Sequence, residues 1–200
     1  VEHLEDCSRM GIEVLPPNVN DCGSDFRVAD GKIYFGLSAV KSCGSGAAES
    51  IVRAREADGP FATIFDFCER VDPQACNRAT IEALIKSGAF DDLGGNRAQF
   101  MAVLDRALQA GAAAAADRKS GQKGLFEDDD EDEQAVAVDL PSVAAWDDNE
   151  QLAAEKEVLG YYLTSHPLEE FKSLLRTFCT HSSASIGNLQ HRDEAVMGGM

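Results

Sequence analysis

Between residue 36 and about residue 110, apolar side chains recur at helical spacing in four short stretches, which glycines and prolines interrupt. The expected helical stretches are residues 37–41, residues 46–57, residues 64–70 leading into 78–87, and residues 96–110. This pattern predicts a compact domain built from two pairs of short helices.

Strand-forming residues lie just before these helices. Residues 26–28 and 32–34 flank Asp30-Gly31, a pair that favours the positive backbone angles of a tight hairpin turn. Residues 152–163 and 168–178 predict two further amphipathic helices, and residues 195–200 are typical of the start of a strand. The predicted fold class is mainly α, with a small β-hairpin, an acidic flexible tether and a C-terminal helical segment.

Residues 41–51 predict a helix end, a glycine turn and a new helix start. The amides of Gly44, Ser45 and Gly46 would be unpaired in the first turn of the new helix and would point at an anion. Lys41 adds a positive charge nearby. The alternative is an ordinary helix connection in which glycine only relieves backbone strain.

Residues 81–97 repeat the order of helix, glycine turn and helix. Two anion-binding helix starts at a fixed spacing suit the phosphates of both strands of duplex DNA. Asp91 and Asp92 would repel phosphate, so the second turn is also consistent with a brace for the first. The candidate DNA-binding residues are Lys41, Ser42, Gly44, Ser45, Gly46, Gly94, Gly95, Asn96 and Arg97.

The net charge of −17 at first argues against nucleic acid. Residues 1–126 hold 18 acidic and 14 basic side chains, residues 127–150 hold 11 and none, and residues 151–200 hold 6 and 4. The acidity therefore belongs mainly to the tether, including the spacer of like charges at residues 127–133. A nearly neutral segment still binds phosphate through local donors and cations.

Gln122 to Phe126 is an apolar-ended peptide within the polar tether. Leu125 and Phe126 side by side suit a hydrophobic pocket on a partner protein, with the Gln122 amide at its rim. The alternative is that both apolar side chains fold back onto the helices.

Several functional classes receive no support from the sequence. No apolar run reaches the roughly 18 to 20 residues of a membrane span, and no signal-peptide pattern begins the chain, so a cytoplasmic location is expected. The cysteines and histidines suggest neither a disulfide framework nor a zinc site. No catalytic constellation and no cofactor are predicted, and His166 before Pro167 more often reflects local packing than chemistry.

A series of ordered matches points to one family. They lie at residues 9–12, 14–17, 35–41, 59–61, 65–72, 81–93, 122–126, 157–163 and 166–168. Across nearly its whole length the chain resembles an internal segment of the alpha subunit of bacterial DNA polymerase III, a DNA-directed DNA polymerase (nucleotidyltransferase) of DNA replication.

The resemblance implies a run from the end of the fingers, through a tandem helix-hairpin-helix domain that contacts double-stranded DNA, to a peptide that docks on the sliding clamp (beta subunit). The peptide's Gln and Leu-Phe fall on Gln122, Leu125 and Phe126. Other replicase subunits are further implied partners. Ser42 stands where the family has the first glycine of a Gly-apolar-Gly turn. The metal-binding aspartates of the palm match nothing here, so Mg²⁺ is expected only for the parent polymerase and this segment is expected to be non-catalytic.

These inferences divide the chain into five parts. They are residues 1–25 (end of the fingers and connector), 26–111 (helix-hairpin-helix domain), 112–150 (acidic tether with clamp peptide), 151–194 (helical linker) and 195–200 (truncated first strand of an OB-fold). The predicted function is to hold duplex DNA and to tether the polymerase to the clamp. A repair-type helix-hairpin-helix module without a clamp partner is the first alternative, and a purely protein-binding adaptor is the second.

Overall fold

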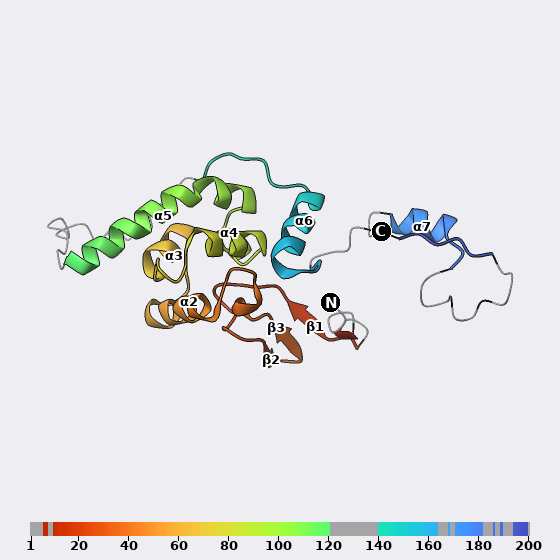
Figure 1. The fold of residues 1–200 in the computed structure, drawn as a ribbon, viewed down its shortest axis with the longest axis horizontal. Coiled ribbons are helices and arrows are strands. Elements are labelled where there is room, and N and C mark those ends of the chain that lie inside the picture. Colours follow the sequence, from red (N-terminus) through yellow and green to blue (C-terminus); the bar gives the residue numbers. More distant parts are fainter. Residues whose placement is uncertain are drawn as a thin grey trace.

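The computed structural model describes residues 6–7, 10–120, 140–163, 168, 171–181, 186, 189 and 194–199. Within these residues the chain is mainly helical with one small sheet, which confirms the predicted fold class (Figure 1). No helix in these residues is long and apolar enough to span a membrane. The predicted tether peptide and the acidic run at residues 127–133 lie outside the described residues.

The small sheet contains the predicted hairpin. Strands β2 (Arg27–Ala29) and β3 (Lys32–Tyr34) pair antiparallel around Asp30 and Gly31, whose φ angles are 54° and 73°. These are the positive angles that the Asp-Gly pair favours. Strand β1 (Glu13–Leu15) adds a parallel partner to β3, giving the order β1-β3-β2. The sequence did not predict β1, which ends where two prolines follow.

The helices of the central domain begin and end at recognisable residues. Short 3₁₀ helix η1 (Leu37–Ala39) precedes α2 (Ser45–Asp58), which ends at Gly59 with φ 82°. Thr63 caps α3 (Ile64–Arg70) and Asn77 caps α4 (Arg78–Lys86), each through a side-chain oxygen that accepts an amide of the first turn. A second 3₁₀ helix, η2 (Asp91–Leu93), leads into α5 (Arg97–Ser120).

Helix α3 lies between α2 and α5 (Figure 1). A Cβ placed on Gly111 of α5 would clash with the carbonyl oxygen of Cys68 in α3, so glycine allows α3 and α5 to approach closely. The core is completed by a chain of aromatic contacts that runs through Phe61, Phe67, Phe90 and Phe100.

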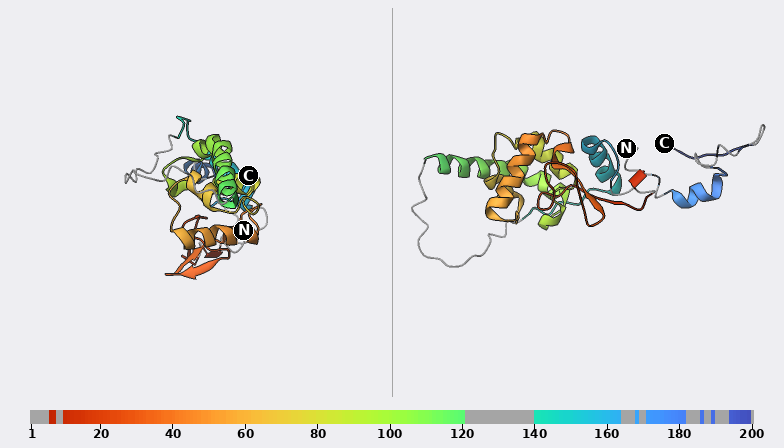
Figure 2. Two further views of the ribbon diagram at one scale, coloured as in Figure 1. Left: turned by 90° about the vertical axis from the view of Figure 1, so that its left-hand side faces the viewer. Right: turned by 90° about the horizontal axis from the view of Figure 1, so that it is seen from below.

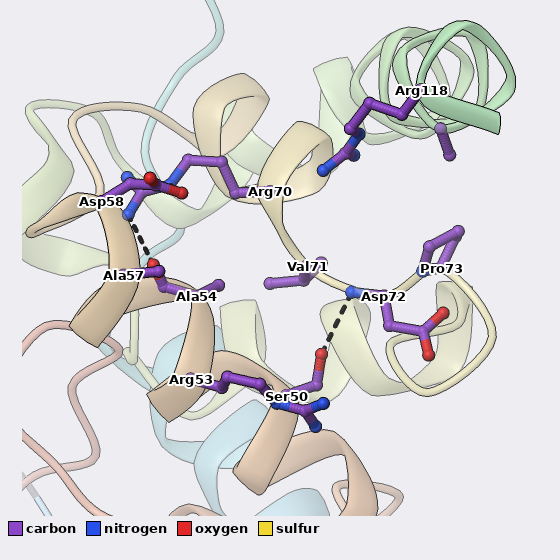
Figure 3. Close-up of a pocket in the computed structure, with 11 residues that line it drawn as sticks. Ser50, Arg53, Ala54, Ala57, Asp58, Arg70, Val71, Asp72, Pro73 and Arg118 are labelled. Atoms are coloured by element: carbon purple, nitrogen blue, oxygen red, sulfur yellow. Dashed lines mark hydrogen bonds and ion pairs between the residues drawn. The ribbon is translucent and has the colours of Figure 1, made fainter. Parts of the chain in front are cut away.

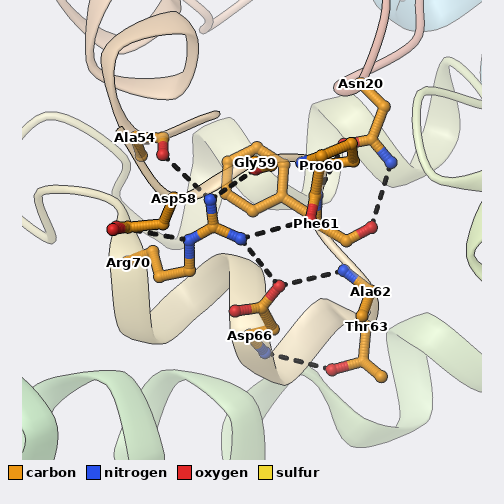
Figure 4. Close-up of polar contacts among 10 residues, drawn as sticks. All are labelled: Asn20, Ala54, Asp58, Gly59, Pro60, Phe61, Ala62, Thr63, Asp66 and Arg70. Carbon is orange, nitrogen blue, oxygen red and sulfur yellow. Dashed lines mark hydrogen bonds and ion pairs between the residues drawn. The ribbon is translucent and has the colours of Figure 1, made fainter. Parts of the chain in front are cut away.

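Arg70 joins the end of α2 to α3 (Figure 4). Its guanidinium donates to the carbonyl oxygens of Ala54 and Gly59 and to the carboxylate of Asp66, and it lies 4.6 Å from the centre of the Phe61 ring. The carbonyls at a helix end lack intrahelical partners, and Arg70 provides donors for them. The Arg70 side chain therefore stabilises the packing of α2 against α3.

Three boundaries differ from the sequence-based expectations. Helix α5 continues to Ser120, ten residues past the expected end, because the alanine run has high helix propensity. Its C-terminal part extends beyond the helical body (Figure 2). Helix α6 (Asp148–Leu159) starts four residues early, at a capping box formed by Asp147 and Glu150. Helix α7 is Lys172–Phe178, and residues 194–199 form no strand, although Val196 bonds to Thr180 and His181.

Candidate nucleic-acid interface

The first glycine turn presents an open helix start. Gly44 is the N-cap of α2 and has no side-chain cap, and the first turn holds no acidic residue. The amides of Ala47 and Ala48 both donate to the carbonyl of Gly44, at 3.1 and 3.0 Å. Within the described part of the chain, the amides of Gly44, Ser45 and Gly46 have no acceptor.

This open start has the physical properties of an anion site. Gly44, Ser45 and Gly46 are exposed, as are Lys41 and Ser42 beside them. A Cβ on Gly44 or Gly46 would meet nothing within 4 Å, so space remains above the amides. The unpaired amides and the helix dipole together favour a negative group at this place. Five of the nine predicted DNA-binding residues are thus brought together.

Two contacts from distant parts of the chain hold the turn in place. The Thr80 hydroxyl donates to the carbonyl oxygen of Ser42 at 2.9 Å. The amide of Lys41 donates to the carbonyl oxygen of Val158 in α6, also at 2.9 Å. Ser42 has φ 66°, a left-handed conformation that non-glycine residues rarely adopt. The turn is therefore positioned from both sides despite the serine.

The second glycine turn is closed. The Asn96 side chain accepts from the amide of Gln99 at 2.9 Å, and the Gln99 side chain accepts from the amide of Asn96 at 3.0 Å. A Cβ on Gly95 would lie 2.6 Å from the Leu140 side chain, so part of the predicted tether of residues 112–150 packs over this turn. Gly94 is exposed and takes the left-handed conformation, with φ 77°. A helix start that is already capped offers fewer free amides to phosphate.

Arg97 is buried and forms ion pairs within the protein. Its side chain is 6% exposed, donates to Asp91 at 2.8 Å and to Glu155 at 3.0 Å, and also reaches the carbonyl of Lys86. Burial acts to lower the pKa of Arg97, but its hydrogen bonds to Asp91 and Glu155 and the attraction of their charges outweigh burial and raise it. A guanidinium held by two carboxylates is not presented to phosphate, so we leave it out of the proposed interface.

The residues that sequence reasoning missed are Thr80, Glu155 and Val158. Each acts on a turn that is far away along the chain, with separations of 38 residues for Thr80 to Ser42 and 58 for Glu155 to Arg97. No local motif marks such partners. Helical periodicity places Thr80 in a helix, yet it does not say which turn lies beside it.

A shallow cavity of about 380 Å³ lies beside the C-terminal half of α2 (Figure 3). Its wall carries Arg53, Arg70 and Arg118 but also Asp58 and Asp72. Because both arginines and aspartates line it, the cavity does not present charge of a single sign to a ligand. It also lies at the other end of α2 from Gly44, so it is not part of the open helix start.

Two further predictions concern metal binding and the clamp peptide. In the described part of the chain, no group of three or more His, Cys, Asp or Glu side chains is arranged to hold a metal ion. The predicted clamp peptide, with Gln122, Leu125 and Phe126, lies outside the described residues and stays a prediction.

Comparison with known proteins adds to this geometry. The helix-hairpin-helix motif family matches residues 11–100. The chain is 39% identical to the DNA polymerase III subunit alpha of Caulobacter vibrioides over 172 residues, 86% of this chain. It is 38% identical to that of Neisseria meningitidis over 98% of the chain, and 41% identical to that of Deinococcus radiodurans over 86%. It spans only 13% to 16% of the length of these relatives.

Proposed function

Because this chain is a relative of the bacterial DNA polymerase III alpha subunits and carries a helix-hairpin-helix motif, we propose that it holds duplex DNA and tethers a replicative polymerase to its sliding clamp. Holding DNA close to the polymerase raises the effective concentration of the primer end, and this increases processivity. The observation that carries the DNA-binding part is the open start of α2, where the amides of Gly44, Ser45 and Gly46 have no acceptor among the described residues.

The mode of binding follows from the chemistry of that helix start. Backbone amides and one nearby lysine recognise phosphate oxygens and not base edges, so the binding is independent of sequence. It is also weak and salt-sensitive, because phosphate contacts release counterions. The capped second turn serves mainly as a brace, which leaves Gly94, Gly95 and Asn96 as secondary candidates.

Duplex binding is tested by titrating a fluorescently labelled duplex with the 200-residue chain at several salt concentrations. Two duplexes of unrelated sequence are expected to bind equally and to lose affinity together as salt rises. Binding that is indifferent to salt, or that depends on base sequence, would contradict the proposal.

The clamp-binding part rests on the peptide Gln122 to Phe126. Leu125→Ala combined with Phe126→Ala is expected to abolish binding to the clamp, because these side chains are the proposed anchors in a hydrophobic pocket. Circular dichroism is expected to be unchanged. Val136→Ala with Val138→Ala, from the same acidic stretch, is the matched control and should bind as the unaltered chain does.

Clamp titration also separates the alternatives. Duplex binding without any clamp binding would favour a repair-type helix-hairpin-helix module. A chain that ignores duplex DNA even at low salt would favour an adaptor that binds only proteins.

A further inference from the structure

Helix α6 brings the Glu157 carboxylate against Lys86, beside the segment that carries Lys41. The Lys86 ammonium of α4 lies 2.9 and 2.8 Å from the two carboxylate oxygens of Glu157. The carbonyl oxygen of the next residue, Val158, accepts a hydrogen bond of 2.9 Å from the backbone amide of Lys41. The last turn of α6 therefore lies against the first glycine turn and the end of α4 together.

Both lysines act on this one carboxylate. The hydrogen bond from Lys86 and the charge of Lys86 lower the pKa of Glu157, and the charge of Lys41 contributes in the same direction. Glu157 is 55% exposed and the Lys86 side chain 25% exposed, so solvent and ions reach the pair. Lys41 is exposed and lies three residues before the N-cap of α2.

An exposed ion pair of this kind contributes little to stability. It is therefore easily exchanged for another anion. A DNA phosphate offers the same sign of charge as the carboxylate and more acceptor oxygens. Lys86 already lies beside the position that a phosphate would take, so only the Glu157 side chain would need to turn away.

We propose that Lys41 and Lys86 form a second phosphate site beside the open start of α2, and that Glu157 occupies this site in the absence of DNA. The Glu157 carboxylate competes with DNA phosphate for the lysines, and this competition weakens DNA binding and allows the DNA to dissociate readily. This inference rests on the proposed function, because the ligand it names is the phosphate backbone of duplex DNA.

The test is a titration of labelled duplex with the full chain at low salt. Glu157→Gln is expected to tighten binding about three- to fivefold, the equivalent of losing a competing exposed ion pair. Glu13→Gln is the matched control: it removes the same charge from another exposed pair, in which Lys32 lies 2.9 Å from Glu13 in the sheet. The control should change affinity much less.

A second substitution identifies the site. In the Glu157→Gln background, Lys86→Met is expected to cancel the gain and to reduce the slope of log affinity against log salt by about 0.9, the value for one phosphate contact. An equal gain in Glu157→Gln and Glu13→Gln would overturn the proposal, since only net charge would matter. A gain that survives Lys86→Met would overturn it too. Failure of every variant, and of the unaltered chain, to bind duplex would instead overturn the proposed function and this inference with it.

Discussion

The hydroxyl of Thr80 donates a hydrogen bond of 2.9 Å to the carbonyl oxygen of Ser42. Thr80 is 1% exposed and lies in the first turn of α4, while Ser42 lies in the turn before α2. The bond connects the two helix pairs at the residue whose backbone is left-handed. The shape of the candidate phosphate site therefore depends on a helix 38 residues away.

Thr80→Val removes this donor and keeps the shape of the side chain. We expect the free energy of unfolding to fall by about 1 kcal/mol, the usual contribution of one hydrogen bond, and duplex affinity to fall because the turn is held less firmly. Urea unfolding and duplex titration measure the two effects. Thr80→Ser keeps the hydroxyl and should restore both; equal losses in both variants would contradict the bracing role.

Ser42→Gly relieves the left-handed backbone. A side chain at φ 66° costs about 1 kcal/mol, from which the greater freedom of glycine in the unfolded chain must be subtracted. The net result is a small rise in the midpoint of thermal unfolding. Ser42→Ala keeps the Cβ and should show no rise. A glycine variant that melts below the alanine variant would show that the serine side chain has a role of its own.

Gly44→Asp separates folding from phosphate binding. The residue has φ −66°, and a Cβ there meets nothing, so aspartate fits and can cap α2. Stability should rise by about 0.5 kcal/mol, because the carboxylate also interacts favourably with the helix dipole. Duplex affinity should fall roughly tenfold, as for the loss of a hydrogen bond to a charged group. Gly44→Asn supplies the cap without the charge and should retain more affinity.

Arg97 and Glu155 form a buried pair, with 6% and 0% of their side chains exposed. Arg97→Met alone should lower the free energy of unfolding by about 3–5 kcal/mol, because Glu155 is left charged and buried. Combining it with Glu155→Leu should recover much of the loss in urea unfolding. Arg78→Met, which breaks the surface ion pairs of Arg78 with Glu82 and Asp105, is the control and should cost far less.

Three buried thiols are expected to make the free energy of unfolding fall as the pH becomes alkaline. Burial raises the pKa of Cys43 from 9.0 to about 11, and those of Cys68 and Cys76 to about 12. In the unfolded chain these thiols ionise from about pH 9, whereas in the fold they stay protonated, so stability is full below pH 9 and falls above it. The urea midpoint should hold up to about pH 9 and drop between about pH 9 and pH 11. A constant midpoint would contradict this, as would rapid alkylation of these three thiols in the folded chain at neutral pH.

Local sequence patterns predicted many of the helices and the β-hairpin. The short helices of the central domain follow from apolar periodicity, with side-chain caps at Thr63 and Asn77 and a glycine end at Gly59, and the β-hairpin follows from Asp30-Gly31. The open start of α2 follows from Gly44 at its N-cap, because glycine has no side chain with which to cap the helix. These features depend on neighbours within a few residues, which the chain order itself supplies.

Only the tertiary structure decided which of those elements contact one another. It closed the second turn with Leu140, buried Arg97 against Glu155, and placed α6 against the first turn through Val158, although the sequence had suggested a linker there. It also paired β1 with β3. These contacts join residues that are far apart along the chain. Their stability comes from burial and from satisfying polar groups in three dimensions, and neither leaves a local pattern in the sequence.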